Sequence, residues 1–588
     1  MGVPGLYKYI CNNVSEAFVK FSNELEEKVA VSEVPKKFHK TLDNLEIDGN
    51  ALLHECTQEI HCYGEKANSI HKEKYDKLKP KKRQLKVFKL FWSIIVEILD
   101  FIKVSKILYL AIDGPCPDNK QNQQRQRRFV SNSCKDGNFN SNCISPGTVF
   151  MQDLNNFLNY KIREYLNDGK SEFKIIYSSF KEPGEGEHKL EKYIKSKPQE
   201  SHCFVGPDGD LIMLGLATNN PKVYLLRRDM MDPGYYNWLD LGIVSKKLPS
   251  LMKYYVPRTP VGKHIELSII TKQTSNDFIF MGTLLGNDFL PKIRMFILLD
   301  DGLNEMIYNY GRSSKISPIT CGKEISLRGL RCFINELNKH EIKYLIDQTF
   351  RRMPHEKYIN KTLLQHVKTN EDTKRPWLYF NYYSIDYYKK AGLSIDKSGK
   401  IKQQEITIMC REYIKSLIWV YLYYVYELPS WNYFYPYRYA PFMNDLARYL
   451  GKVSEKEFKE LHNFELGEPC LPFQQLMNIL PETSKELLPE SLHGVYEKSK
   501  LVEANYYREP TIDYEGVMND HSAVVNIEFV NTKLVTKVYN KLNKDKELDN
   551  YPRNQHEVYH TFSFDKNREV TTYESSYGNI EECLVSRE

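Results

Sequence analysis

No apolar run in the sequence reaches the roughly 20 residues that a membrane-spanning helix needs. The N-terminal sequence MGVPGLYKYI also lacks the continuous apolar segment of a secretory signal peptide. We therefore expect neither insertion into a membrane nor secretion.

The 12 cysteines include no CxxC pair, and a chain of 588 residues does not need disulfides for stability. Residues 54–62 hold two histidines and two cysteines, but the second paired half of a structural zinc site is missing. We interpret the cysteines as reduced thiols of an intracellular protein and do not expect zinc.

The chain also lacks a strong excess of one charge, because Lys and Arg exceed Asp and Glu by only 82 − 76 = +6. Net charge therefore does not identify a nucleic-acid-binding protein. The hydrophobic fraction of 41% and the charged fraction of 27% are those of a folded globular protein. At roughly 150 residues per domain, the length allows several domains. Function has to be inferred from local patterns.

Short runs rich in β-branched and aromatic residues alternate with helical stretches in the first half of the chain. They are NLEID (44–48), KILYLAID (106–113), FKIIYSS (173–179), SHCFVGPDGD (201–210) and KVYLLRR (222–228). This alternation predicts an α/β domain with a mostly parallel sheet and flanking helices. Residues 277–292, DFIFMGTLLGNDFLPK, predict an apolar helix that runs into an acidic turn.

A second block is very rich in tyrosine and tryptophan, above all within residues 416–446, and ends in the strand-like sequence VVNIEFV (524–530). We expect four parts along the chain. They are a catalytic α/β domain (1–355), a connector (356–375), a mainly helical second region (376–545) and a polar, mobile tail (546–588).

Seven carboxylates recur at the predicted strand ends and turns: Asp48, Asp113, Glu185, Glu187, Asp208, Asp210 and Asp288. The carboxyl ends of parallel strands share one edge of a sheet, where these groups would repel each other unless cations neutralised them. Carboxylate ligands without histidine or cysteine suit Mg²⁺ or Mn²⁺. Two such ions, about 4 Å apart, support hydrolysis of a phosphodiester. Each motif alone also fits a helix start, a turn or a loop cap.

A basic helix is predicted directly after Asp113, in GPCPDNKQNQQRQRRF. Lys120, Gln124, Arg127 and Arg128 lie at i, i+4, i+7 and i+8, and so share one helical face. Three cations and an amide on one face form a suitable receptor for a terminal phosphate. The alternative is a solvated basic surface helix.

An imidazole and an indole can hold unpaired bases between them without reading their sequence. His54 follows Asp48 closely, and the second block supplies Trp419 and Trp431. Taken alone, each tryptophan also fits core packing, and His54 fits an ordinary helix residue.

At these residues the sequence resembles the XRN family of 5′→3′ exoribonucleases. The likeness extends over IDGNALLHEC, AIDGPCPDNKQNQQRQRRF, EPGEGEHKLEKYI, GPDGDLIMLGLA, MGTLLGNDFLPK and PSWNYFYPYRYAPFMNDL in this order. It implies that the seven acids bind two Mg²⁺ (or Mn²⁺) ions and that Lys120, Gln124, Arg127 and Arg128 hold a 5′-phosphate. It further implies that His54 stacks on a tryptophan, for which we choose Trp419, with Trp431 as the second choice.

The resemblance also implies a PIN/flap-nuclease-like core that the second region encloses, so that only a single strand enters. The expected activity is processive degradation of 5′-monophosphorylated single-stranded RNA to nucleoside 5′-monophosphates by a monomer. The pair usually written Asp-Ala-Asp in this family is DGD here, which keeps both acids. The chain also ends soon after the second region, without the long C-terminal extension of the large cytoplasmic members.

Two other functions stay open. A flap-type DNA endonuclease uses a similar acidic site, although such enzymes usually lack the aromatic second block. A catalytically inactive RNA-binding scaffold would keep only the tunnel, but all seven acids are present. We expect a cytoplasmic protein. The sequence PKKRQLK (80–86) resembles a nuclear-import patch, but it also begins a predicted amphipathic helix.

Overall fold

The computed structural model describes twelve stretches of the chain. They are residues 5–22, 38–67, 72–131, 139–229, 232, 234–253, 267–296, 299–350, 355–497, 500–514, 516–517 and 523–588. The first four residues of MGVPGLYKYI lie outside this part.

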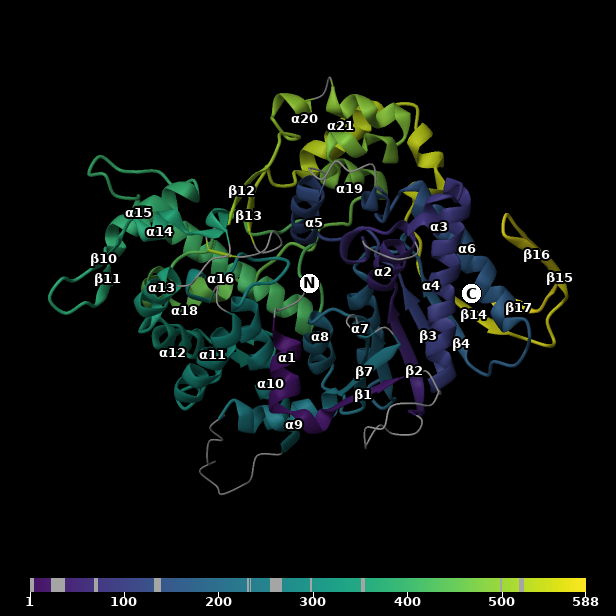
Figure 1. The fold of residues 1–588 in the computed structure, drawn as a ribbon, viewed down its shortest axis with the longest axis horizontal. Coiled ribbons are helices and arrows are strands. Elements are labelled where there is room, and N and C mark those ends of the chain that lie inside the picture. The colour runs from purple at the N-terminus through teal and green to yellow at the C-terminus, as the bar shows by residue number, and fades with distance from the viewer. Residues whose placement is uncertain are drawn as a thin grey trace.

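A nine-stranded sheet forms the centre of the fold, in the order β1-β7-β6-β5-β2-β3-β4-β14-β17 (Figure 1). The strands are β1 (Phe18–Ser22), β2 (Lys40–Asp48), β3 (Ile102–Ala111), β4 (Lys174–Ser178), β5 (His202–Val205), β6 (Val223–Arg228), β7 (Tyr235–Asp240), β14 (His560–Phe564) and β17 (Val585–Arg587). Strands β6, β5, β2, β3 and β4 run parallel, whereas β7 and β14 pair antiparallel on either side of them. The α/β class and all five predicted strands are confirmed.

Both faces of the sheet are covered because its strands alternate between two apolar cores. On β3, Leu108 and Leu110 belong to one core and Tyr109 and Ala111 to the other. The first core includes α2 (Gly49–His61), α4 (Pro80–Phe101) and α6 (Val149–Leu166). The second includes α7 (Gly186–Ser196), α8 (Asp210–Ala217) and α10 (Leu267–Leu284). The helix predicted within 277–292 is therefore confirmed, and it ends at Leu284 before the acidic turn.

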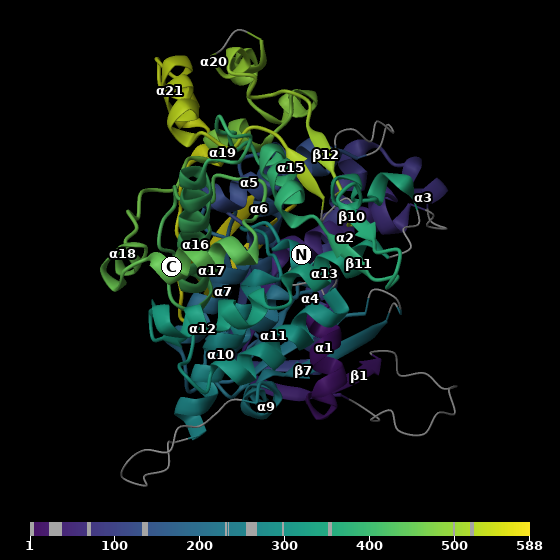
Figure 2. The same cartoon turned by 90° about the vertical axis from the view of Figure 1, so that its left-hand side faces the viewer.

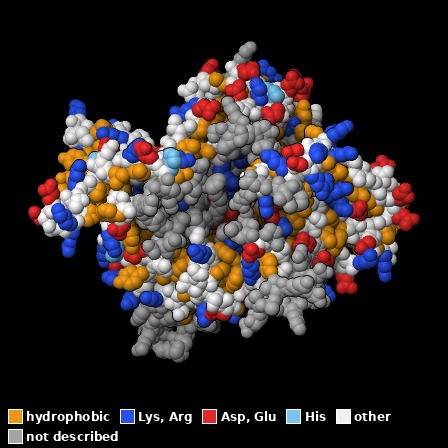
Figure 3. All heavy atoms as spheres, in the orientation of Figure 1, with side chains coloured by type: hydrophobic (Ala, Val, Ile, Leu, Met, Phe, Trp, Pro, Cys, Tyr) orange, Lys and Arg blue, Asp and Glu red, His pale blue; other side chains and the backbone are white. Residues whose placement is uncertain are grey.

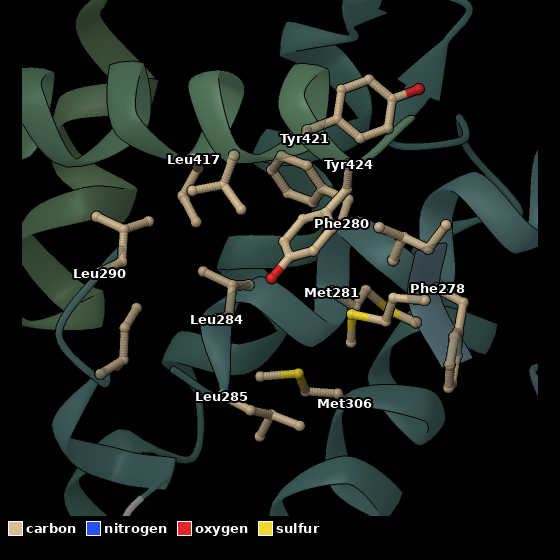
Figure 4. Packing of buried hydrophobic residues seen from close by; sticks show 14 of the residues in the cluster. Phe278, Phe280, Met281, Leu284, Leu285, Leu290, Met306, Leu417, Tyr421 and Tyr424 are labelled. Atoms are coloured by element: carbon tan, nitrogen blue, oxygen red, sulfur yellow. The ribbon is translucent and has the colours of Figure 1, made fainter. Parts of the chain in front are cut away.

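The second region shares a core with the α/β domain. Its central helix, α16 (Gln403–Val425), is buried along most of its length. Leu417, Tyr421 and Tyr424 of α16 pack against Phe280 and Leu284 of α10 (Figure 4). Seen from the side in Figure 2, α16 and α17 (Met443–Lys452) lie beside α10 and α12 (Leu327–Asn338). None of the described helices combines the length and the hydropathy that a bilayer crossing requires.

Residues 546–588 do not form the expected mobile tail. Strand β14 pairs antiparallel with β4, and its Phe562 is fully buried. A hairpin of β15 (Thr571–Ser575) and β16 (Gly578–Cys583) precedes β17 at the edge of the sheet. A half-buried edge strand needs an apolar side chain only at alternate positions, so a polar average composition conceals it.

Two further segments differ from the expected boundaries. The connector (356–375) contributes β10 (Val367–Thr369), which pairs with β11 (Pro376–Leu378) across the expected boundary. Of VVNIEFV, only Val524–Asn526 form a strand, β13, which pairs with β12 (Thr511–Asp513). The remainder runs along α5 (Asp118–Ser131), where Arg125 donates to the carbonyl of Glu528 at 3.0 Å.

Candidate active site

The predicted acids lie together beyond the carboxyl ends of the parallel strands. Asp48 ends β2, and Asp113 and Asp208 follow β3 and β5. Glu185 precedes α7, Glu187 lies in its first turn, Asp210 begins α8, and Asp288 lies in the turn after α10. This is the edge where active sites of open α/β sheets form.

Gly186 lies beside the carboxylates of both Asp48 and Asp113. Its backbone N–H donates to Oδ1 of Asp113 at 2.7 Å. A Cβ atom at Gly186 would lie 3.3 Å from Oδ1 of Asp113 and 3.5 Å from Oδ1 of Asp48. A larger residue would therefore crowd the carboxylate of Asp113, whereas its contact with Asp48 would have an ordinary length, so glycine is favoured between Glu185 and Glu187.

Asn50 fixes the same two acids from the start of α2. Its Nδ2 donates to Oδ2 of Asp113 at 2.8 Å, and its Oδ1 accepts from the backbone N–H of Asp113 at 3.2 Å. Its own backbone N–H donates to Oδ1 of Asp48 at 3.2 Å. The IDGN sequence thus supplies the carboxylate of Asp48 and the side-chain amide of Asn50, which orients Asp113.

Burial and crowding perturb the acids strongly. Burial, with Asp113 and Asp208 nearby, raises the pKa of Asp48 to about 8. Burial and Asp288 raise the pKa of Asp210 to about 7. Burial also raises the pKa of Glu187 well above its usual value. In the absence of bound cations, these groups thus hold protons that free carboxylates would have lost.

The donor chemistry of this cluster fits a hard divalent cation. Oδ1 of Asp210 is buried, and no hydrogen-bond partner for it occurs among the described residues. Such an acceptor costs free energy unless a cation or donor satisfies it. No group of three histidine, cysteine or acidic side chains in the described ranges already meets the geometry of a metal site. The seven acids remain the residues that would hold Mg²⁺ or Mn²⁺.

Lys120 lies within the acidic cluster rather than apart from it. Its Nζ forms ion pairs with Glu185 and with Oδ2 of Asp288, the latter at 2.8 Å. Burial alone would lower the pKa of Lys120, but Asp288 and Glu185 raise it well above its usual value. Burial would raise the pKa of Asp288, and Lys120 instead holds it at about 2. The predicted phosphate ligand Lys120 therefore stays charged and neutralises part of the acidic cluster.

The other three residues of the predicted basic face are placed differently from Lys120. Arg128 donates to Oγ of Ser145 through Nη2 at 2.8 Å, and burial and Arg127 lower its pKa to about 10. Oε1 of Gln124 accepts from Gln475 at 3.4 Å. Arg127 is exposed. Arg128 is thus held by Ser145, whereas Arg127 is exposed, and both arginines line the cavity described next.

One large cavity, of about 2490 Å³, unites these groups. The cavity is lined by six of the seven acids, by all four residues of the basic face and by His54. Asp210 is the acid that does not line it. The facing wall comes from the second region, with Tyr387, Tyr435, Tyr437, Arg438, Tyr439 and Phe529. Both regions thus build the cavity.

His54 lies near the basic face. Burial, followed by Arg127 and Arg128, lowers the pKa of His54 to about 3. The ring is therefore neutral at physiological pH and half-buried at the cavity wall.

Neither predicted tryptophan lines this cavity beside His54. Trp419 has 0% exposure, donates its Nε1–H to the carbonyl of Ser430 at 3.2 Å and packs against Phe289 and Tyr423. Trp431 is half-buried and is also absent from the cavity wall. The indole of Trp419 is enclosed in the core and exposes no face to the cavity, so the structure does not bring it together with His54. The reason is that α16 is apolar on nearly all sides, which places Trp419 in the core.

The structure adds site residues that were not predicted. The hydroxyls of Tyr423 and Tyr424 donate to Glu185 and Asp210, and the guanidinium of Arg438 lies 3.7 Å above the ring of Phe529 at the cavity wall. The run of tyrosines within residues 416–446 was the available signal, because a tyrosine hydroxyl needs a partner when it is buried. The sequence gives no indication of which partner it finds.

The acidic cluster, the basic helix and the aromatic wall of the second region thus meet at one cavity of an α/β protein. The family model described as "XRN 5'-3' exonuclease N-terminus" matches residues 1–138 and 130–229, and the one described as "Xrn1 helical domain" matches residues 355–583. The chain belongs to the XRN family.

Curated relatives match nearly the whole chain at low identity. The human "5'-3' exoribonuclease 1" is 26% identical, with 100% of this chain and 37% of the relative covered. The Saccharomyces cerevisiae protein of the same name is 24% identical, with 91% and 42% covered. The "5'-3' exoribonuclease 2" of Yarrowia lipolytica is 24% identical, with 95% and 71% covered. The chain therefore spans less than half the length of the first two.

A solved structure, the catalytic core of Rad2 in complex with DNA substrate, matches 77% of this chain and 97% of its own. Its TM-score of 0.31 and sequence identity of 10% are too low to support conclusions on fold or substrate. The flap-nuclease likeness of the core thus stays an expectation.

Proposed function

We propose that this chain is a processive 5′→3′ exoribonuclease that hydrolyses 5′-monophosphorylated single-stranded RNA to nucleoside 5′-monophosphates. It would act as a monomer in RNA decay, in the cytoplasm, with two Mg²⁺ or Mn²⁺ ions. The observation that supports this proposal most is the common cavity, whose wall carries both the acidic cluster and the basic face of α5.

Bound divalent ions would supply Lewis-acid stabilisation of a phosphodiester under attack by water. The seven acids would hold them, and Asn50 keeps the carboxylates of Asp48 and Asp113 oriented. Lys120 remains charged beside Glu185 and Asp288, where it reduces the repulsion between these acids and the incoming phosphate.

Arg127, Arg128 and Gln124 would bind the 5′-phosphate. Charge-assisted hydrogen bonds favour a phosphate dianion over a 5′-hydroxyl end, and a cap would obstruct them. His54 would offer its neutral ring to a base near this end. The 5′ terminus would thus be held on one side of the cleaved bond while the acids act on it.

The decisive test compares RNAs that differ only at the 5′ end. The purified chain is incubated with 5′-monophosphate, 5′-triphosphate, 5′-hydroxyl and capped RNA, with and without Mg²⁺. We expect mononucleotide release from the 5′-monophosphate RNA alone, and only with metal. Equal decay of all four RNAs would contradict the phosphate pocket.

Two additional arms address the other functions. Preferential cleavage of a branched flap DNA would identify a structure-specific endonuclease instead. Binding of single-stranded RNA without cleavage under any metal condition would identify an inactive scaffold. Asp208→Ala serves as the control for contaminating nucleases.

A further inference from the structure

Positive charge is concentrated in one short segment away from α5. Residues 65–89 contain ten Lys and Arg and three Asp and Glu, a net charge of 10 − 3 = +7. Since the whole chain carries +6, all other residues together carry 6 − 7 = −1. Figure 3 shows Lys and Arg side chains gathered in the region of α3 (Lys72–Asp76) and α4.

We call these lysines the lysine face. Its members are Lys66, Lys72, Lys74, Lys77, Lys79, Lys81, Lys82, Lys86 and Lys89. All are exposed except Lys66, which is half-buried. In the described part of the chain, none of them forms an ion pair with an acid, whereas Arg83 in the same segment pairs with Asp76 at 2.9 Å. The lysines therefore contribute nothing to the fold through ion pairs with described residues.

Helix α4 carries four lysines of the lysine face and places three of them on its solvent side. Val87, Phe88 and Phe91 of α4 are buried in the core, which leaves the opposite side of the helix in solvent. Lys82, Lys86 and Lys89 lie there at i, i+4 and i+7. From Lys82 to Lys89 the helix rises about 10 Å, which equals about three stacked nucleotides at 3.4 Å each.

The inner end of the lysine face belongs to the cavity of the active site. Lys66, Lys86 and Lys89 line the same cavity as Arg127, Arg128 and the acids. Tyr75 also lines it and places an aromatic ring among the lysines. The lysine face thus begins at the cavity with Lys66, Lys86 and Lys89 and includes further exposed lysines that do not line it.

We propose that the lysine face is a second RNA-binding surface, which holds phosphates of the strand beyond the acidic cluster and the basic face of α5. Lysine binds phosphate as a mobile point charge, which suits contacts that must form and break as a strand advances. The direction of the strand, with its 5′ end in the cavity, rests on the proposed function. The affinity of the lysine face for a polyanion is independent of the proposed function.

The test measures binding of uncleaved RNA in the Asp208→Asn background. Two single-stranded 5′-phosphorylated RNAs are compared, one just long enough to reach the acids from the basic face of α5 and one several times longer. The variant is the triple change Lys82→Glu, Lys86→Glu and Lys89→Glu. The matched control is Lys452→Glu, Lys456→Glu and Lys459→Glu, which makes the same charge change at exposed lysines that do not line the cavity.

We expect the lysine-face variant to bind the long RNA about tenfold more weakly at low salt, with little change for the short RNA. Its plot of log affinity against log salt should become shallower by about 2, because three phosphate contacts contribute about 0.7 each. The control should match the parent. If the triple Glu variant fails to fold, the corresponding triple Gln variant is measured, with a smaller shift in the same direction.

Unchanged binding of the long RNA, or an equal loss in the control, would overturn the proposal. If RNA binding is unchanged but a fluorescent fusion of the full chain loses nuclear accumulation, the segment is a nuclear-import patch instead. RNA binding that depends on these lysines in a chain that cleaves no RNA would support the lysine face and refute the nuclease function.

Discussion

The hydroxyl of Tyr423 donates a hydrogen bond to Oε1 of Glu185 at 2.9 Å, although 238 positions separate the two residues in the chain. One residue further along α16, the hydroxyl of Tyr424 donates to Oδ2 of Asp210 at 3.1 Å. Two of the seven acids are thus oriented by the second region. The second region therefore orients acids of the cluster through hydrogen bonds, and it also supplies part of the cavity wall.

We predict that Tyr423→Phe and Tyr424→Phe each raise the Mg²⁺ concentration needed for half-maximal cleavage. A residue that orients a metal ligand typically contributes 10- to 100-fold in metal affinity or activity. Tyr421→Phe is the matched control on the same helix, because its hydroxyl donates to the carbonyl of Gly322, away from the acids. A Mg²⁺ titration distinguishes the variants. Equal midpoints for all three would mean that the hydroxyls only support packing.

We predict that Asp208→Ala and Asp210→Ala abolish cleavage and preserve the fold. Each substitution removes a ligand, but it also relieves repulsion in a crowded site. The two should differ in stability, since Asp210→Ala leaves the buried hydroxyl of Tyr424 without its acceptor, at a cost of about 1 to 3 kcal/mol. Thermal melting and cleavage assays are performed on the same preparations. Near-normal turnover in both variants would exclude these acids as ligands.

Much of this site could be predicted from local sequence. Short runs rich in β-branched and aromatic residues ended in acids, and a basic helix followed Asp113, so the acidic cluster and the basic face of α5 could be predicted from the sequence. The partners of Tyr423 and Tyr424 were not, because a helix that is buried on nearly all sides gives no indication of which face meets which neighbour. Trp419 shows the same limit: it was chosen as a base-stacking residue and lies in the core.

We predict that the metal-free protein loses stability as the pH rises from about 4 to about 8. The folded-state pKa of Asp48 is raised from 3.8 to about 8, and that of Asp210 from 3.8 to about 7. The folded protein therefore binds more protons than the unfolded chain in this window, so each rise in pH favours unfolding. Melting in EDTA should show this slope, and Mg²⁺ should reduce it. Asp48→Asn should flatten the slope in EDTA, and an unchanged slope would contradict the assignment.

We predict that Arg127→Ala and Arg128→Ala reduce the preference for 5′-monophosphate over 5′-hydroxyl RNA. Each removes a charge-assisted hydrogen bond of about 1.5 to 3 kcal/mol to phosphate, equivalent to at least tenfold in selectivity. Arg128→Lys should recover the charge but not the planar contact with Ser145, so its selectivity should be intermediate. The ratio of kcat/KM for the two RNAs is the measurement. An unchanged ratio in the double alanine variant would show that this face is only solvated surface.

The last prediction separates His54 from Trp419, which were expected to act as a pair. His54 lines the cavity beside Arg127 and Arg128, so His54→Ala should leave cleavage detectable but shorten each run along the RNA. A stacked base contributes about 1 to 3 kcal/mol, comparable with the roughly 1.4 kcal/mol of a duplex stacking step, so the variant should stall at an internal hairpin. Trp419→Ala should instead lower the unfolding free energy by about 3 to 5 kcal/mol, because it empties part of the core. A time course on RNA with a single-stranded 5′ lead and a hairpin, run well below each melting temperature, compares the two variants. If Trp419→Ala stalls at the hairpin with normal stability, the indole is a base contact after all; if His54→Ala passes the hairpin at the parent rate, its ring holds no base.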